Sequence, residues 1–181
     1  MQLRSCRLTI RFSYPHVIDL RDMIKVIQDN AYIVPRDLPP SPPGSIVIGS
    51  FTASKDSIVF EFNNSSGVMS FSVSSFDEIP KAVSDFKEIV KELRLGDIDF
   101  IELVSEILVK GNLKLDCKLF GKELSGFEIT EENSLIRLSN YPALRNTYVL
   151  TIIYKFKEIG ETDKFLSETK KVIDSVTSNI S

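Results

Sequence analysis

Two nine-residue stretches decide the fold: KDSIVFEFN at residues 55–63 and ENSLIRLSN at residues 132–140. Each begins with a short polar turn and then alternates apolar and polar side chains, which is typical of a strand with one buried face. A further strand is expected after each stretch, at residues 68–74 and 148–156, and a long amphipathic helix follows. The pattern therefore predicts two halves of the same kind, although their sequences share little identity.

The first half opens with a strand and a short helix. Residues 6–13 alternate strictly, so we expect a half-buried strand whose outer face carries Arg7 and Arg11. Apolar residues at helical spacing from Val17 to Ile27 predict an amphipathic helix that ends near Asn30. The five prolines that follow before Gly44 predict a stiff, extended loop.

Three strands and a long helix complete the first half. The strands are expected at residues 46–53, 57–63 and 68–74. The helix is expected to start at about Asp77, with Ser75 or Asp77 as its cap. The side chains expected to point inward are Ile58, Phe60, Phe62, Met69, Phe71 and Val73 from the strands, and Ile79, Val83, Phe86, Ile89, Val90 and Leu93 from the helix.

Residues 97–110 fit both a helix and a strand, because apolar residues occur at both spacings. We expect a strand, since a strand must open the second half as residues 6–13 open the first. A hairpin at Lys110 to Asn112 is then expected to lead into a strand at residues 113–120. The chain is expected to end in a helix over about residues 162–178.

Composition excludes several classes of protein. The chain has 181 residues, a formal charge of −3 and no apolar run long enough to span a membrane, so we expect a cytoplasmic protein that does not coat nucleic acid by charge. Its single histidine, His16, has no nucleophile motif nearby, and Cys6 and Cys117 belong to no metal-binding pair. Both cysteines are expected to be buried thiols; whether they lie close together is left open. We therefore expect no catalytic residues, no bound metal and no cofactor, and a chain that is not an enzyme.

Two short motifs are similar to those of the TATA-box-binding protein family. Residues 43–47, PGSIV, stand where that family has a Phe-Pro-Gly run leading into a strand, and residues 66–70, SGVMS, stand where it has Ser-Gly-Lys-Met-Val. The similarity covers mainly residues 6–95. It implies an α+β fold in which a duplicated antiparallel sheet, shaped as a saddle, carries two long amphipathic helices on one face. The halves would be residues 1–96 and 97–181, joined into one continuous sheet. The alternative is a helix-grip-like sheet wrapped on the C-terminal helix.

The resemblance does not extend to the residues that contact DNA. The run at residues 43–47 lacks the phenylalanine that the family wedges into the minor groove, and the turn at residues 66–70 lacks the lysine. In that family the opening strands of the two halves pair with each other. We therefore expect Arg7 and Arg11 to face Glu102 and Glu106 across this pair. The alternative is a free basic patch in which Arg4, Arg21, Lys25 and Arg36 join them.

These observations favour a non-enzymatic protein that binds a macromolecular partner, protein rather than nucleic acid, through the exposed sheet face or its rim loops. One alternative is a nucleic-acid-binding protein of the same fold. Another is a small hydrophobic ligand held between sheet and helices, which Phe60, Phe71, Phe86 and Tyr154 would line. Free sheet edges also make a homodimer an expectation. The candidate contact residues are Arg7, Arg11, Lys25, Arg36, Phe51 and Tyr141.

Overall fold

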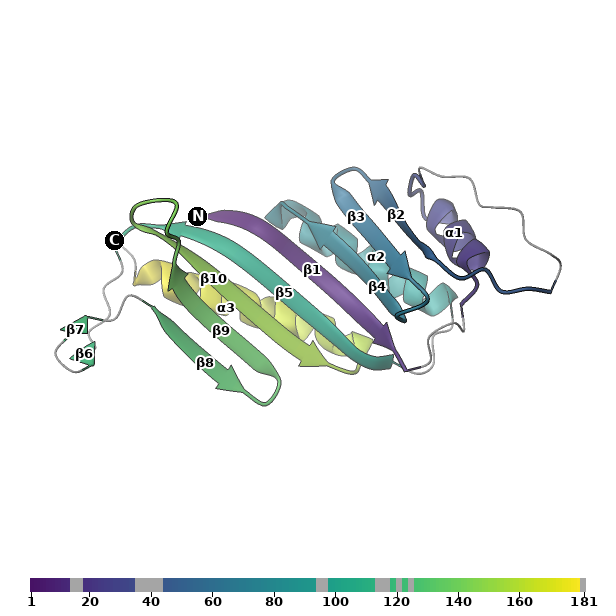
Figure 1. The fold of residues 1–181 in the computed structure, drawn as a ribbon. Coiled ribbons are helices and arrows are strands. Elements are labelled where there is room, and N and C mark those ends of the chain that lie inside the picture. Colours follow the sequence, from purple (N-terminus) through teal and green to yellow (C-terminus); the bar gives the residue numbers. More distant parts are fainter. Residues whose placement is uncertain are drawn as a thin grey trace. The chain divides into compact units, whose positions relative to one another are not determined.

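The computed structural model describes residues 1–13, 18–34, 44–93, 98–112, 118–119, 122–123 and 126–179. Over these ranges it is an α+β protein with an eight-stranded antiparallel sheet and three α-helices, which confirms the expected class (Figure 1). The chain divides into two compact units. One comprises Arg7–Glu102 and is called the 7–102 unit; the other comprises Met1–Cys6 and Leu103–Ser181 and is called the 103–181 unit.

The strands of the 7–102 unit bury one face and expose the other. They lie in the order β2, β3, β4, β1, β5, and the strand order within the 103–181 unit is β1, β5, β10, β9, β8. The bounds are β1 Gln2–Phe12, β2 Ser50–Lys55, β3 Ile58–Asn63, β4 Val68–Val73 and β5 Ile98–Lys110. Every second residue of β3 is buried, as the alternation predicts.

Two helices cover the buried face of the 7–102 unit. They are α1 (Leu20–Asp29) and α2 (Ile79–Glu92), and α2 follows the short 3₁₀ helix η1 (Phe76–Glu78). The Asp19 side chain caps α1 by accepting from the Arg21 N–H at 2.8 Å, and Ser75 caps η1. Beneath the helices, Phe71 lies with ring centroids 5.0 Å from Phe60 and 5.8 Å from Phe86. These contacts form the core of the unit.

The 103–181 unit repeats the three-strand and helix part of this plan. Its strands are β8 (Phe127–Glu131), β9 (Ser134–Asn140) and β10 (Thr147–Phe156), and α3 (Thr162–Ser178) follows the 3₁₀ helix η2 (Ile159–Glu161). The ring of Phe165 on α3 stacks on that of Phe156, with 4.8 Å between centroids, and its centroid lies 4.9 Å from that of Tyr154. The helix α3 therefore packs against β10. A separate two-stranded sheet pairs β6 (Lys118–Leu119) with β7 (Lys122–Glu123).

Most expected elements are confirmed. Residues 98–110 form a strand and not a helix, and α3 matches its expected range. The first strand and first helix are present, but the strand begins earlier than expected, at Gln2, and the helix begins at Leu20. Cys6 is buried as a free thiol. The proline-rich loop, His16, Cys117 and most of the strand expected at residues 113–120 lie outside the described residues.

Two details of the strand prediction are wrong. The strand expected at residues 46–53 begins only at Ser50. The backbone N–H groups of Val47 and Gly49 donate to the side chains of Asp19 and Asn64 and not to a neighbouring strand. The strand β8 was not expected. Gly126 precedes it, and a Cβ there would lie 2.2 Å from the carbonyl oxygen of Leu138, so only glycine permits this close approach to β9.

The aromatic core yields a stability prediction. Replacing Phe71, which is 1% exposed, with Ala should lower the free energy of unfolding by about 3–5 kcal/mol, because the cavity removes contacts with several rings. Urea unfolding followed by circular dichroism measures this. Ser84→Ala, at an exposed site on α2, is the control and should change stability by less than about 0.5 kcal/mol. A loss below about 1 kcal/mol for Phe71→Ala would contradict the described core.

Candidate functional site

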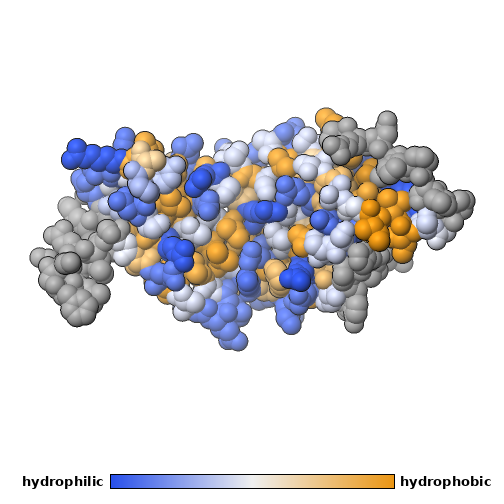
Figure 2. Space-filling view, in the orientation of Figure 1, coloured by the Kyte–Doolittle hydropathy of each residue, from blue (hydrophilic) through white to orange (hydrophobic). Residues whose placement is uncertain are grey.

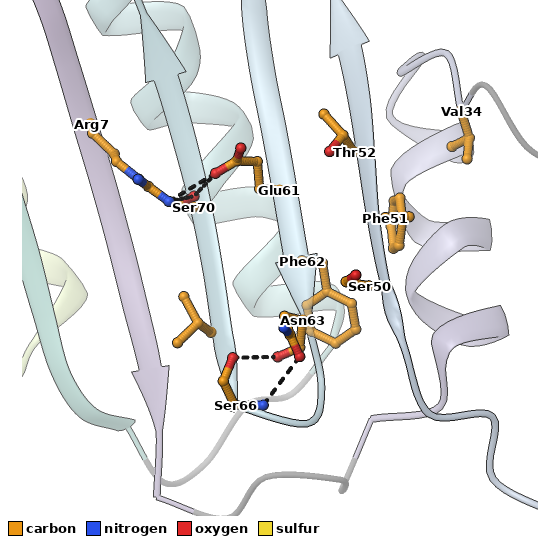
Figure 3. Close-up of a pocket in the computed structure, with 11 residues that line it drawn as sticks. Arg7, Val34, Ser50, Phe51, Thr52, Glu61, Phe62, Asn63, Ser66 and Ser70 are labelled. Atoms are coloured by element: carbon orange, nitrogen blue, oxygen red, sulfur yellow. Dashed lines mark hydrogen bonds and ion pairs between the residues drawn. The ribbon is translucent and has the colours of Figure 1, made fainter.

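A groove of about 600 Å³ opens on the 7–102 unit (Figure 3). Strands β1, β2, β3 and β4 all contribute to it. Its lining combines hydroxyl and amide side chains with apolar ones and a single pair of charges. The lining residues are Arg7, Val34, Ser50, Phe51, Thr52, Glu61, Phe62, Asn63, Ser66, Val68 and Ser70.

A bonded triad of side chains crosses one side of the groove. Arg7 donates from Nη2 to Glu61 at 2.8 Å and to the Ser70 hydroxyl at 3.0 Å, and Ser70 donates to Glu61 at 3.3 Å. Arg7 and Glu61 are about half exposed, whereas Ser70 is buried beneath them. Because the bonds of Arg7 within the described residues use only Nη2, its Nε and Nη1 are available to a ligand. The groove is therefore polar but carries no net charge.

The other side of the groove is fixed by the turn between β3 and β4 and by aromatic packing. The side-chain Oδ1 of Asn63 accepts from the Ser66 N–H at 3.2 Å, and the backbone carbonyl oxygen of Asn63 accepts from the Ser66 hydroxyl at 3.4 Å. Phe51 lies 5.6 Å from Phe60 and 5.9 Å from Phe62, measured between ring centroids. Phe51 therefore lines the groove and also packs against the core rings of Phe60 and Phe62, which fix its position.

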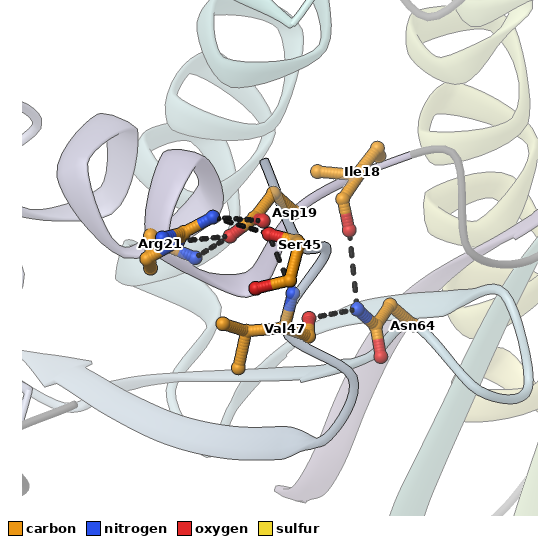
Figure 4. A network of polar contacts seen from close by, with 6 residues as sticks. All are labelled: Ile18, Asp19, Arg21, Ser45, Val47 and Asn64. Carbon is orange, nitrogen blue, oxygen red and sulfur yellow. Dashed lines mark hydrogen bonds and ion pairs between the residues drawn. The ribbon is translucent and has the colours of Figure 1, made fainter. Parts of the chain in front are cut away.

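A polar network fixes the segment that leads into β2 (Figure 4). Asn64, which is 2% exposed, donates to the carbonyl oxygens of Ile18 and Val47 and accepts from the Gly49 N–H. Asp19 accepts from the Val47 N–H at 3.1 Å and from the Arg21 guanidinium. These bonds satisfy backbone groups that have no strand partner, so the groove is flanked by a fixed segment.

The same segment carries exposed apolar side chains. Ile46 and Ile48 are more than half exposed, and Figure 2 shows apolar atoms gathered where the chain enters β2. Large exposed isoleucines next to a polar groove are typical of a surface that contacts another molecule.

The structure brings two of the six candidate residues together. Arg7 and Phe51 both line the groove. Arg11 lies elsewhere on β1, and Lys25 is exposed on α1. Tyr141 belongs to the 103–181 unit, where its backbone N–H donates to Thr147. The sixth residue, Arg36, lies outside the described residues.

The arginines of β1 are paired with carboxylates, but with other partners than expected. Arg7 binds Glu61 of β3, and Arg11 lies 3.8 Å from Asp99. The expected role of Glu106 is wrong, because it lies 3.7 Å from Arg4 instead. Sequence reasoning also missed Glu61 as a partner, since it lies on a different strand of the same sheet face.

The described part of the chain holds neither a cluster of metal ligands nor an exposed cysteine. No group of three or more His, Cys, Asp or Glu side chains there could hold a metal ion. Burial raises the pKa of Cys6, to which Ser105 donates at 3.5 Å, so the thiol is held in its unreactive protonated form. What the groove offers is hydrogen bonding and apolar contact.

A scan against protein-family models and a search of curated proteins find no match to this sequence. None of the helices over the described ranges combines the length and apolar character needed to cross a membrane.

The Figure 4 network gives a pH-dependent prediction. The hydrogen bonds from Arg21 hold the pKa of Asp19 well below its usual range, so Asp19 stabilises the fold above its ordinary pKa of about 4. This contribution should be lost as the pH falls below about 4. In Asp19→Asn, stability should drop by about 1 kcal/mol at pH 7, and the difference from wild type should shrink in acid.

Urea midpoints at neutral and acid pH measure this effect. Asp22→Asn, an exposed position in the first turn of the same helix, is the control. A difference between wild type and Asp19→Asn that is equal at both pH values would contradict the role given to Asp19.

Proposed function

We propose that this chain is a non-enzymatic binding protein that holds a protein partner in the groove of the 7–102 unit. The observation that carries the proposal is the composition of the groove, in which one internally neutralised charge pair stands among hydroxyl, amide and apolar side chains. Protein interfaces combine apolar contacts with hydrogen bonds in this way and contain few unpaired charges at their centre.

The charge pairing of β1 argues against nucleic acid as the partner. Binding to a phosphate backbone releases counterions and needs free Lys or Arg side chains. Arg4, Arg7 and Arg11 each lie within 4 Å of a carboxylate. Breaking such pairs would offset part of the gain from phosphate contacts, so a protein surface is the better complement.

The proposal includes a duplicated architecture of the kind seen in the TATA-box-binding protein family. The succession of a strand hairpin, a third strand, a 3₁₀ turn and a long helix in each unit supports it. We propose that the two units are copies of one β-rich unit and that the fold has been retained without the DNA-contacting residues.

An affinity experiment tests the groove as the binding surface. Thr52 is exposed and lines the groove, so Thr52→Trp should block it. Immobilised wild-type protein should retain specific proteins from an extract of the native host, and Thr52→Trp should lose them. The matched control is Thr130→Trp, an exposed threonine on β8. Retention that is equal in both variants, or that disappears with nuclease treatment, would contradict the proposal.

Nucleic-acid binding is tested separately. Fluorescence anisotropy with a labelled DNA duplex and a labelled single-stranded RNA should show no binding at about 50 mM salt, where electrostatic affinity is strong. Binding at this salt concentration that weakens steeply at about 200 mM would favour the nucleic-acid alternative instead.

A further inference from the structure

The 103–181 unit has an open patch on the side of its strands that faces α3. Strand pairing fixes which residues of the two units are equivalent. The pair Lys55 and Ile58 closes the β2–β3 turn, and the pair Glu131 and Ser134 closes the β8–β9 turn. Counting from these pairs, Ile129 corresponds to Ala53 and Ile136 corresponds to Phe60.

In the 7–102 unit this position is covered by the chain's own helix. The helix α1 packs against α2, and its Met23 and Ile27 are fully buried. Phe60 and Ala53 beneath are 0% and 2% exposed. An amphipathic helix therefore seals the outer strands, beside the helix that seals β4.

In the 103–181 unit the corresponding strands are left open. Leu150 and Ile152 of β10 are fully buried, whereas Ile129 of β8 is 50% exposed and Ile136 and Phe127 are only half-buried. Figure 1 shows α3 behind β10, and among the described elements no helix lies behind β8.

The side of α3 that borders these strands is also incompletely covered. The 3₁₀ helices η1 and η2 lead directly into α2 and α3, so Val83 and Ile89 correspond to Leu166 and Val172. The two residues of α2 are buried, but those of α3 are half-buried. The open patch comprises Phe127, Ile129, Ile136, Leu166 and Val172.

The charges around the open patch differ from those of the covered position. In the 7–102 unit, Asp85 accepts from Lys55 Nζ at 2.9 Å and from the Tyr32 hydroxyl at 2.9 Å. The equivalent positions hold Glu131 in place of Lys55 and Glu168 in place of Asp85. Within the described residues neither glutamate is in a salt bridge. Burial raises the pKa of Tyr154, and the charges of Glu168 and Glu131 raise it further. Both carboxylates therefore lie near the Tyr154 hydroxyl.

We propose that the open patch binds an amphipathic helix of a partner protein, and that this helix carries Lys or Arg to meet Glu131 and Glu168. The apolar stripe of such a helix would cover Ile129, Ile136 and Val172, as α1 covers its own strands. This site lies in the other unit from the groove and goes beyond the proposed function.

A second copy of the chain is a poorer occupant. The apolar faces of α1 and α2 are buried within their own unit, and α3 leaves only Leu166 and Val172 half-buried, so in the described residues a copy has no free helix stripe to offer. A formal charge of −3 also makes the copy a poor complement to two glutamates.

A peptide titration tests the proposal on the full chain. The probe is a labelled synthetic helical peptide of about 18 residues, with Leu and Ile in one stripe and Lys on the opposite face. A peptide of the same composition without the stripe, and one with Glu for every Lys, are the comparisons. Only the basic striped peptide should bind, with saturation.

Four protein variants locate the binding. Ile129→Asp, and separately Glu131→Lys with Glu168→Lys, should raise the Kd for the basic peptide by about tenfold or more. The double charge reversal should also bind the acidic striped peptide. Glu88→Lys with Asp174→Lys changes the net charge equally at exposed sites elsewhere and should alter the Kd by less than about twofold. Thr52→Trp should leave the Kd unchanged, which separates this site from the groove.

Several results would overturn the proposal. One is the absence of saturable binding of the basic striped peptide. Another is equal affinity for this peptide and for the peptide of the same composition without the stripe. A loss of affinity in Glu88→Lys with Asp174→Lys as large as that in the patch variants would show non-specific attraction. If sedimentation shows a dimer that Ile129→Asp dissociates, a second copy covers the patch instead. Circular dichroism of each variant verifies that it folds.

Discussion

The packing of Phe71 is the interaction on which the 7–102 unit depends. Its ring contacts Phe60 of the neighbouring strand, Phe86 of α2 and Tyr32 just after α1, so a single side chain joins a strand and both helices. Because strand side chains alternate, fixing Phe71 and Phe60 inward places Ser70 and Glu61 outward. The groove and its bonded triad therefore follow from the same constraint that builds the core.

The 103–181 unit satisfies this constraint with one helix. Phe165 packs on Tyr154 and Phe156, which seals β10 but does not reach β8. The inner face of the five strands that contribute to this unit is wider than one helix, since strands lie about 5 Å apart and a helix with its side chains is about 10 Å across. The apolar side chains beyond that width are left half-exposed. Among the residues that the structure describes, Glu131 and Glu168 beside them form no salt bridge of the kind that Lys55 makes with Asp85.

Local periodicity predicted most of the fold, because a strand or helix that is buried on one side has apolar residues at a regular spacing in the sequence. The inward-facing residues of β3 and β4 and the range of α3 followed from spacing alone. The groove did not, since it depends on which strands are neighbours: Arg7 and Glu61 are far apart in the chain and meet across Ser70. The start of β2 was misplaced for a similar reason. The alternation at Ile46 and Ile48 is that of a strand, but Asp19 and Asn64 bind the backbone in place of a neighbouring strand.

A shift of one residue separates the sequence overlay from the equivalence that strand pairing gives. The overlay matched Lys55 with Glu132, whereas the closing pairs of the two turns match Lys55 with Glu131. Since successive side chains of a strand point to opposite faces, this shift exchanges the inner and outer faces of β9. It moves Ile136 from the position of exposed Val59 to that of buried Phe60, whereas in both registers a glutamate stands where Asp85 has Lys55 as its cation. The contrast between a self-sealed unit and an open one is therefore visible only once the register is known. If the units are copies, as proposed, reversal of one charge and exposure of the residues equivalent to Ala53 and Phe60 are sufficient to turn a core position into a surface that can bind a partner.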